Sequence, residues 1–186
     1  MKLTLFNILF EKKIDVPTKS SFFYGEKYTE DPTKKQIDKD NYYKPKLDWN
    51  GLDLALENPK GTYRKGVDKD GNEWKNRIYY DYGEIHGYVG KDKDYLDFFM
   101  GPKPDSDFVF IIDQMKIDSD KFDEHKIMLG FKTKQEAIDA YLKNYDKDWK
   151  KRQGGKIQGV ATDVEGLKDW LENRTKQKPA NETINV

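Results

Sequence analysis

The apolar positions are unevenly spread along the chain and divide it into three parts. Residues 1–50 hold few apolar side chains after Phe10, so we interpret them as an extended N-terminal arm. Residues 51–174 carry short apolar stretches separated by turn residues, which is typical of a folded domain built mainly from strands. Residues 175–186 are mostly polar, and we expect a flexible tail there.

Short strands are predicted through most of this domain. The longest apolar stretch, Phe108–Met115, has the character of a central strand. An Asp-Lys-Asp-Gly turn at residues 68–71 predicts a hairpin between the strands on either side of it. The other predicted strands are 54–57, 62–67, 74–80, 84–89, 96–100 and 126–131. Many short strands at this spacing favour a small barrel.

Two helices are predicted after the strands. Residues 133–136 and 162–165 each have the Thr-x-x-Glu pattern of a capping box, which marks the beginning of a helix. Each box is followed by apolar side chains on one helical stripe. The stripes are Ala137, Ile138, Tyr141, Leu142 and Tyr145 in the first helix, and Val164, Leu167, Trp170 and Leu171 in the second.

Composition narrows the functional classes. Aromatic residues make up 14% of the chain, which argues for a folded core although 37% of residues are charged. The 34 basic and 34 acidic residues cancel, so we expect no nucleic-acid partner. No apolar run reaches the roughly 20 residues of a membrane span, so no membrane partner is expected. The absence of cysteine excludes thiolate metal sites and disulfides, and it is compatible with the cytoplasm.

Two acidic clusters are the main candidates for chemistry. Asp92, Asp94 and Asp97 stand directly before an apolar strand, and a second cluster spans residues 118–126. Carboxylates concentrated in this way favour hard cations such as Mg²⁺, Mn²⁺ or Ca²⁺. We expect the oxygens of Asp92, Asp97 and Glu124 to converge within reach of one or two cations. The alternative is that both clusters are solvated polar turns, as hairpin tips often are.

The spacing of these residues resembles a known family. A Tyr-Gly-x-Ile string at 82–85 precedes Asp92-x-Asp94-x-x-Asp97 by ten residues, which resembles the signature of the family I soluble inorganic pyrophosphatases. Further matches are Glu57, Arg64, Arg77, Asp118, Glu124, Lys126 and Tyr145.

The sequence is most similar to a divergent branch of that family, the pyrophosphatase-like domain of phages and of polyvalent mobile-element proteins. The matching strings are Arg64-Lys-Gly66, Gly71-Asn-Glu-Trp74, residues 81–85 and the ten residues Phe-Asp-Glu-His-Lys-Ile-Met-Leu-Gly-Phe at 122–131. The resemblance covers about Leu54 to Trp170. Departures from the wider family occur at Gly66, Ile78, Tyr95 and Asp146.

The resemblance implies a fold and a set of roles. The implied fold is α+β but mainly β, a small five-stranded OB-like closed barrel with two or more flanking helices. The implied cofactor is Mg²⁺, with Mn²⁺ as a substitute, held by Asp92, Asp97, Asp118, Glu124 and Glu57. The implied catalytic residues are Asp94, which would orient or deprotonate the water, with Tyr82 and Lys126. The implied substrate-binding residues are Arg64, Arg77, Tyr145 and Lys147.

Several of these residues have simpler interpretations. Arg77 suits a surface ion pair, Tyr145 suits the packing between helix and barrel, and Lys126 suits the start of a strand. His125 alternates with its neighbours on an extended chain, so we expect it to have a structural role on the opposite face. We also expect Trp74 and Trp170 to belong to the core.

Two functions from different classes are compatible with the sequence. The first is Mg²⁺-dependent hydrolysis of inorganic pyrophosphate, or of a related small phosphoanhydride, in the cytoplasm of a bacterial host. The second is a non-catalytic phage or mobile-element structural or accessory protein, associated with the virion, that keeps the barrel. The arm would then dock into a larger assembly; a homo-oligomer is the other partner prediction. The complete carboxylate set favours the enzyme.

Overall fold

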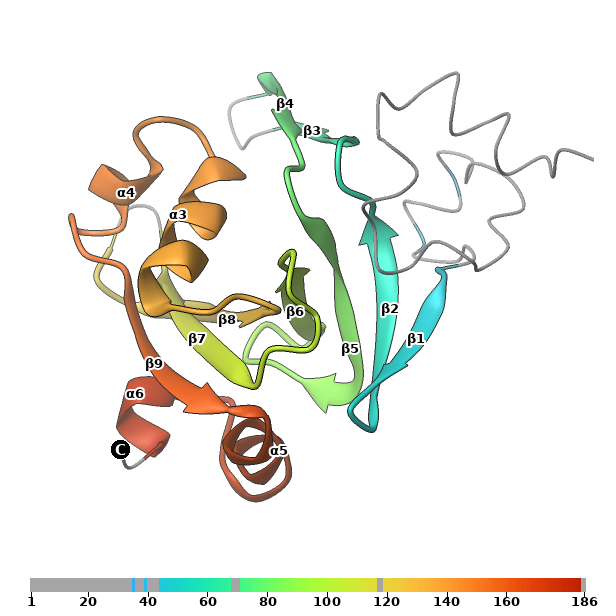
Figure 1. Cartoon of the computed structure of the whole chain (residues 1–186). Helices are drawn as coiled ribbons and strands as arrows, with labels where there is room; N and C mark the ends of the chain where they lie inside the picture. Colours follow the sequence, from blue (N-terminus) through green and yellow to red (C-terminus); the bar gives the residue numbers. More distant parts are fainter. Residues whose placement is uncertain (1–34, 36–38, 40–43, 68–70, 117–118, 185–186) are drawn as a thin grey trace, which may run out of the picture.

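A twisted sheet dominates the computed structural model, which describes residues 35, 39, 44–67, 71–116 and 119–184 (Figure 1). The described residues form nine strands. These are β1 (Lys46–Trp49), β2 (Leu52–Asn58), β3 (Tyr63–Val67), β4 (Glu73–Arg77), β5 (Asp81–Val89), β6 (Tyr95–Met100), β7 (Phe108–Met115), β8 (Phe122–Leu129) and β9 (Gln158–Asp163). Seven of them make one sheet in the order β1-β2-β5-β6-β8-β7-β9, and β3 and β4 pair separately as a hairpin.

The prediction of a five-stranded OB-like closed barrel is wrong. The sheet has seven strands, and its outer strands β1 and β9 each pair with one neighbour rather than with each other. A closed barrel has no edge strand, whereas this sheet has two edge strands, β1 and β9, among the described residues. The strand order also contains a parallel pair, β6 with β8, between antiparallel neighbours. The prediction of a mainly β domain with flanking helices is correct.

Side chains alternate between the two faces of the sheet along each strand, and one hydrophobic core forms on each face. On β6, Leu96, Phe98 and Met100 enter one core, whereas Phe99 enters the other. On β8, Ile127 belongs with the first core and Met128 with the second. Since Asp97 and Lys126 alternate with the first-core residues, they lie on the face of the second core.

Four short helices cover these cores in the described part of the chain. They are α3 (Lys134–Lys143), α4 (Trp149–Arg152), α5 (Val164–Asn173) and α6 (Ala180–Thr183). Thr133 caps α3 as predicted, by accepting a hydrogen bond from the Glu136 N–H. The cap of α5 is Asp163 rather than Thr162, because the Asp163 carboxylate accepts from the Gly166 N–H at 2.7 Å. Helix α3 packs on the second core, and α5 packs on the first.

The division into arm, domain and tail stays a prediction, and most of the arm lies outside the described residues. Two details bear on its boundaries. Strand β1, which the sequence assigned to the arm, pairs with β2. Ala180, which the sequence assigned to the tail, is fully buried in the first core. No helix in the described part of the chain is long and apolar enough to cross a membrane.

We predict that Asp113→Ala destabilises the fold by about 1–3 kcal/mol, because it leaves buried N–H groups without an acceptor. The buried Asp113 carboxylate on β7 accepts from the N–H groups of Ala180 at 2.6 Å and Asn181 at 3.1 Å. It therefore holds α6 against the sheet. The measurement is urea unfolding. The exposed residue Asp105 offers a matched control, and Asp105→Ala should stay within about 0.5 kcal/mol of wild type. Equal losses for both variants would contradict this role.

Candidate active site

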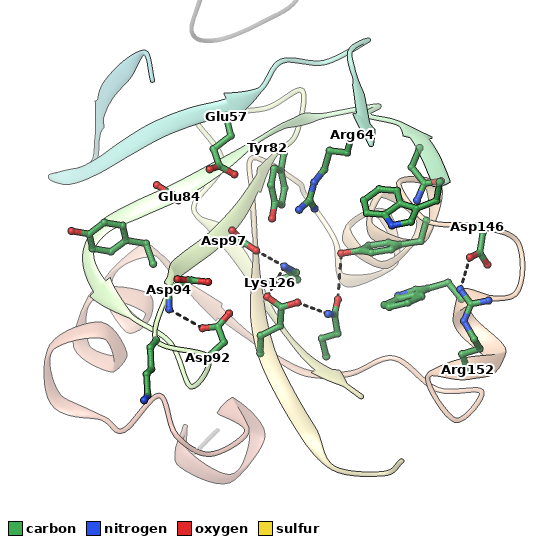
Figure 2. Close-up of a pocket in the computed structure, with 18 of the residues that line it drawn as sticks. Glu57, Arg64, Tyr82, Glu84, Asp92, Asp94, Asp97, Lys126, Asp146 and Arg152 are labelled. Atoms are coloured by element: carbon green, nitrogen blue, oxygen red, sulfur yellow. Dashed lines mark hydrogen bonds and ion pairs between the residues drawn. The ribbon is translucent and has the colours of Figure 1, made fainter. Parts of the chain in front are cut away.

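A large pocket opens on the face of the second core and has a volume of about 1440 Å³. Strands β2, β5, β6, β7 and β8 supply its floor, and the β3–β4 hairpin supplies one wall. The segment after α3 together with α4 supplies another wall. Figure 2 shows carboxylates concentrated at one end of the pocket, Arg64 near its middle, and Asp146 with Arg152 at the other end.

Strand pairing places three charged residues in a row across the floor. Glu84 on β5 is opposite Asp97 on β6, and Asp97 is opposite Lys126 on β8. Directly paired residues lie on the same face of a sheet, so the three side chains point into the pocket together. Glu124 lies two positions before Lys126 and therefore shares its face.

The Lys126 ammonium lies between two of these carboxylates. It contacts Asp97 directly, and its Nζ is 2.7 Å from Glu124 Oε2. Burial disfavours the charged form, yet Asp97, Tyr82 and Glu124 together hold the pKa of Lys126 well above its ordinary value. Lys126 is therefore a permanent cation at the centre of the acidic floor.

Glu124 is also bound on its other side. Its Oε1 accepts a hydrogen bond from the Gln114 amide on β7. Burial raises the pKa of Glu124, Lys126 works in the opposite direction, and the Asp97 and Asp92 carboxylates add to the rise. The raised pKa of Glu124 therefore comes mainly from burial, and Lys126 lowers this pKa by more than the neighbouring carboxylates raise it.

Glu57 forms a second acidic group with Glu84. Lys44 Nζ lies 2.8 Å from Glu57 Oε1 and 2.9 Å from Glu84 Oε1, so one ammonium serves both. Burial nevertheless raises the pKa of Glu57 to about 7, against the opposing effect of Lys44. Glu57 is therefore close to half-protonated near neutral pH.

Asp92 and Asp94 lie in the turn between β5 and β6. The Asp94 N–H donates to Asp92 Oδ1 at 3.2 Å, which fixes the shape of this turn. Burial raises the pKa of Asp92, and the charges of Asp94 and Asp97 raise it further. Both carboxylates line the pocket beside Asp97 (Figure 2).

Arg64 brings a second cation toward the floor from the hairpin. Its guanidinium lies over the ring of Tyr82, 4.5 Å from the ring centroid. Tyr82 is buried, and burial raises the pKa of its hydroxyl well above the ordinary value, so this group is neutral and available as a hydrogen-bond donor. Arg64 from the hairpin wall and Lys126 from the floor thus both lie near the Tyr82 ring, 4.5 Å and 5.7 Å from its centroid.

Aromatic side chains form the end of the pocket next to α3 and α4. The Tyr145 hydroxyl donates to Gln114 Oε1 at 3.3 Å, and the Tyr145 ring stacks on Trp149 with centroids 4.4 Å apart. Burial raises the pKa of Tyr145 to about 12. Tyr145 therefore packs against Trp149 and also lines the pocket, while its predicted role in binding substrate stays a prediction.

Most of the predicted site residues meet in this pocket. Those that line it are Glu57, Arg64, Tyr82, Asp92, Asp94, Asp97, Glu124, Lys126 and Tyr145. Arg77 and Lys147 do not. Arg77 pairs with Tyr63 across the hairpin, on the face opposite Arg64, and its guanidinium lies over Tyr79 at 5.6 Å. Lys147 is exposed outside the pocket. Asp118 lies outside the described residues.

Trp74, Trp170 and His125 were all expected to lie outside the site, and two of the three do. Trp170 is fully buried, as expected, whereas Trp74 is 39% exposed and lines the pocket, so its assignment to the core is wrong. His125 lies on the opposite face from the site, between Phe122 and Trp170. Burial lowers the pKa of His125 to about 3, so this imidazole is neutral and structural.

The predicted convergence of Asp92, Asp97 and Glu124 is not present. Among the described residues, no three carboxylate or imidazole groups are arranged to hold a metal ion, and the Lys126 ammonium lies between Asp97 and Glu124. The donor set nevertheless fits a hard divalent cation. It consists of carboxylate oxygens, which are the ligands that hard cations prefer, and several of these carboxylates line one end of the same pocket.

Sequence reasoning missed Glu84, Gln114 and Trp149 as pocket residues. Glu84 carried a usable signal, because it is two positions after Tyr82 on a strand and must share its face. Gln114 follows five apolar residues and Asp113 on the central strand, so it stands out there as a polar residue. Trp149 carried no such signal, since its position depends on how α4 folds back on α3.

We predict that Glu57 makes the metal-free protein less stable as pH rises from about 4.5 to about 7. The folded-state pKa is raised above the ordinary 4.5, so the native state binds more protons than the unfolded state in this window. Because the buried neutral His125 makes stability rise with pH up to about 6.5, the test is a difference: urea unfolding across this range should give wild type a more negative slope of stability against pH than Glu57→Gln. The exposed Glu73→Gln serves as a control and should keep the wild-type slope. An identical slope in all three proteins would contradict the raised pKa.

Comparison with known proteins bears on the identity of this site. Neither the curated proteins nor the solved structures gave a match. A family model described as Inorganic Pyrophosphatase matches residues 34–172, which is well over half of the chain. The matched range contains every described strand and the whole pocket. The chain therefore belongs to the inorganic pyrophosphatase family.

Proposed function

We propose that this protein hydrolyses inorganic pyrophosphate or a related small phosphoanhydride, with water as the nucleophile and Mg²⁺, or Mn²⁺ in its place, as the cofactor. The observation that carries the proposal is the pairing of an acidic floor with two cations that face the same space, Lys126 and Arg64. Hydrolysis of a phosphoanhydride needs both components, because the substrate and the metal have opposite charges.

The cations suit the phosphate oxygens. Arg64 presents a planar guanidinium that can donate two parallel hydrogen bonds, and Lys126 is a point charge beneath it. Tyr82 and Tyr145 both have neutral hydroxyls that line the pocket. Tyr82 can donate a hydrogen bond to a phosphate oxygen, and Tyr145 can do so once its hydroxyl leaves Gln114 Oε1. These groups would orient the substrate and neutralise the charge on the leaving phosphate.

The carboxylates suit the metal. Asp92, Asp97 and Glu124 would hold Mg²⁺, while Glu57 and Asp118 would serve ions that arrive with the substrate. A divalent cation bound there neutralises the carboxylates and promotes the ionisation of water. Asp94 would accept the proton of the attacking water or orient it. Arg77 and Lys147 are not part of this proposal, since neither lines the pocket.

One observation favours the non-catalytic alternative. Lys126 already neutralises Asp97 and Glu124, so the floor is partly compensated without a metal. A protein that only kept the fold would use this ion pair for packing. Location in a bacterial cytoplasm or a virion, and assembly through the arm, stay predictions under either alternative.

Asp97→Asn should reduce kcat for phosphate release from pyrophosphate by at least about 100-fold, which is the scale of losing one central electrostatic group. Tyr145→Phe should cost at most about tenfold, because it removes one neutral hydrogen bond. The measurement is phosphate release with Mg²⁺ or Mn²⁺, with circular dichroism to verify folding.

Asp53→Asn provides the matched control for this experiment. Asp53 is on β2, is about half exposed, and pairs with Lys46 away from the pocket. It should retain wild-type activity. Full activity of Asp97→Asn would refute the mechanism. A wild-type protein without activity on any phosphoanhydride would favour the non-catalytic alternative.

A further inference from the structure

We propose that the pocket binds a nucleoside di- or triphosphate, with the base stacked on Trp74 and the phosphates held by Arg64 and Lys126. The inference rests on the proposed function for the hydrolysis step, but not for the binding itself. Pyrophosphate would leave a part of the pocket unfilled.

Trp74 presents an aromatic surface to this part of the pocket. Its side chain is 39% exposed and lines the pocket from β4. One side of the indole covers Gly66, its partner across the hairpin. A Cβ atom at position 66 would lie 2.4 Å from Trp74 Cζ2, so only glycine lets the ring lie in this position. Among the described residues, no other ring contacts the indole.

The hairpin carries the stacking residue and the phosphate-binding residue on one face. Arg64 pairs with Asn76, and Gly66 pairs with Trp74. Because residues two apart on a strand share a face, Arg64, Trp74 and Asn76 all point into the pocket, where each of them is found. Asn76 is the partner of Arg64, and Trp74 lies two residues, or roughly 7 Å, from Asn76 along β4. A ribose between base and phosphate suits this spacing.

The opposite wall is already complete. Tyr145 covers one side of the Trp149 ring, and the Arg152 guanidinium lies over the same indole, 5.3 Å from its centroid. Arg152 is in turn paired with Asp146 at the rim (Figure 2). Trp149 is therefore a fixed structural element.

Tyr95, another exposed ring that lines the pocket, is already stacked on His86 with centroids 4.8 Å apart. Among the described residues, this leaves Trp74 as the exposed pocket ring without an aromatic partner.

The dimensions of the pocket agree with a larger ligand. Its volume of about 1440 Å³ exceeds the roughly 300–1,000 Å³ typical of pockets for drug-sized molecules. Pyrophosphate is a small polyanion with no apolar surface, so stacking on an indole would not contribute to its binding. A nucleotide combines a flat base with a polyphosphate chain, and base–aromatic stacking stabilises such complexes without strong preference for the base.

Hydrolysis of a nucleotide bound in this way needs water as its only co-reactant. The water oxygen forms a bond to a phosphorus atom, and the bond from that phosphorus to the bridging oxygen breaks. One proton of the water is taken up by the leaving oxygen or by solvent. The nucleotide product has lost the group that was transferred to water.

Calorimetric binding provides a test that does not require catalysis. The two ligands are a β,γ-methylene analogue of a nucleoside triphosphate and methylenediphosphonate, each with Mg²⁺. Trp74→Ala should weaken the nucleotide analogue by about tenfold or more, the scale of one lost base–aromatic stack, and leave methylenediphosphonate within about twofold. Trp74→Phe should restore most of the affinity, because a ring remains.

Two further variants separate stacking from general effects on the hairpin. Gly66→Ala keeps the indole but displaces it, so it should also weaken the nucleotide analogue selectively. Tyr63→Ala removes another exposed aromatic side chain from the same hairpin, on the face opposite Trp74, and should change neither affinity.

The outcomes distinguish this inference from the proposed function. If Trp74→Ala weakens both ligands equally or neither, the inference is overturned, whereas pyrophosphate hydrolysis by wild type would still support the proposed function. If wild type hydrolyses no phosphoanhydride but loses nucleotide affinity with Trp74→Ala, the proposed function fails and the nucleotide site stands.

Discussion

The contact of Lys126 with Asp97 and Glu124 is the interaction on which the site depends. Strand pairing places these carboxylates together on a partly buried floor, where unpaired charges are expensive. A buried ion pair is seldom the most stable solution, since apolar residues of similar size often stabilise a core better. Its presence at the centre of the largest sheet therefore indicates a use beyond stability. The same ammonium that neutralises the floor is positioned to meet an anionic substrate.

The remaining architecture separates this charged floor from the apolar interior. Alternation on β6 and β8 sends Phe98 and Ile127 into the core beneath α5, while Asp97 and Lys126 face the pocket. Helix α3 closes the same face further along, so the pocket is bounded by packed residues rather than by loops alone. The β3–β4 hairpin contributes Arg64 and Trp74 to the pocket. The indole can occupy its position because residue 66 is a glycine.

Local features of the fold could be predicted from the sequence, whereas long-range ones could not. The apolar run of β7 and the Thr133 cap of α3 depend on neighbouring residues, and both were predicted. The parallel pairing of β6 with β8 joins strands separated by β7 in the chain, and no local pattern specifies it. Spacing also identified Asp92, Asp94 and Asp97, which line the pocket, but it did not identify Glu84. It could not show that the hairpin register turns Arg77 away from Arg64, or that Lys126 would lie between the acids instead of beside them.

Under the proposed function, Lys126 must leave Asp97 and Glu124 when a metal and substrate bind, because the metal would take the carboxylates and the substrate would take the ammonium. Crystals grown with Mn²⁺ and imidodiphosphate would test it most directly, since anomalous scattering locates the metal. The account predicts Mn²⁺ on Asp92, Asp97 and Glu124, with the Lys126 ammonium withdrawn from the carboxylates and bound to a phosphate oxygen. Carboxylates that stay paired with Lys126, with no Mn²⁺ beside them at saturating concentration, would contradict it.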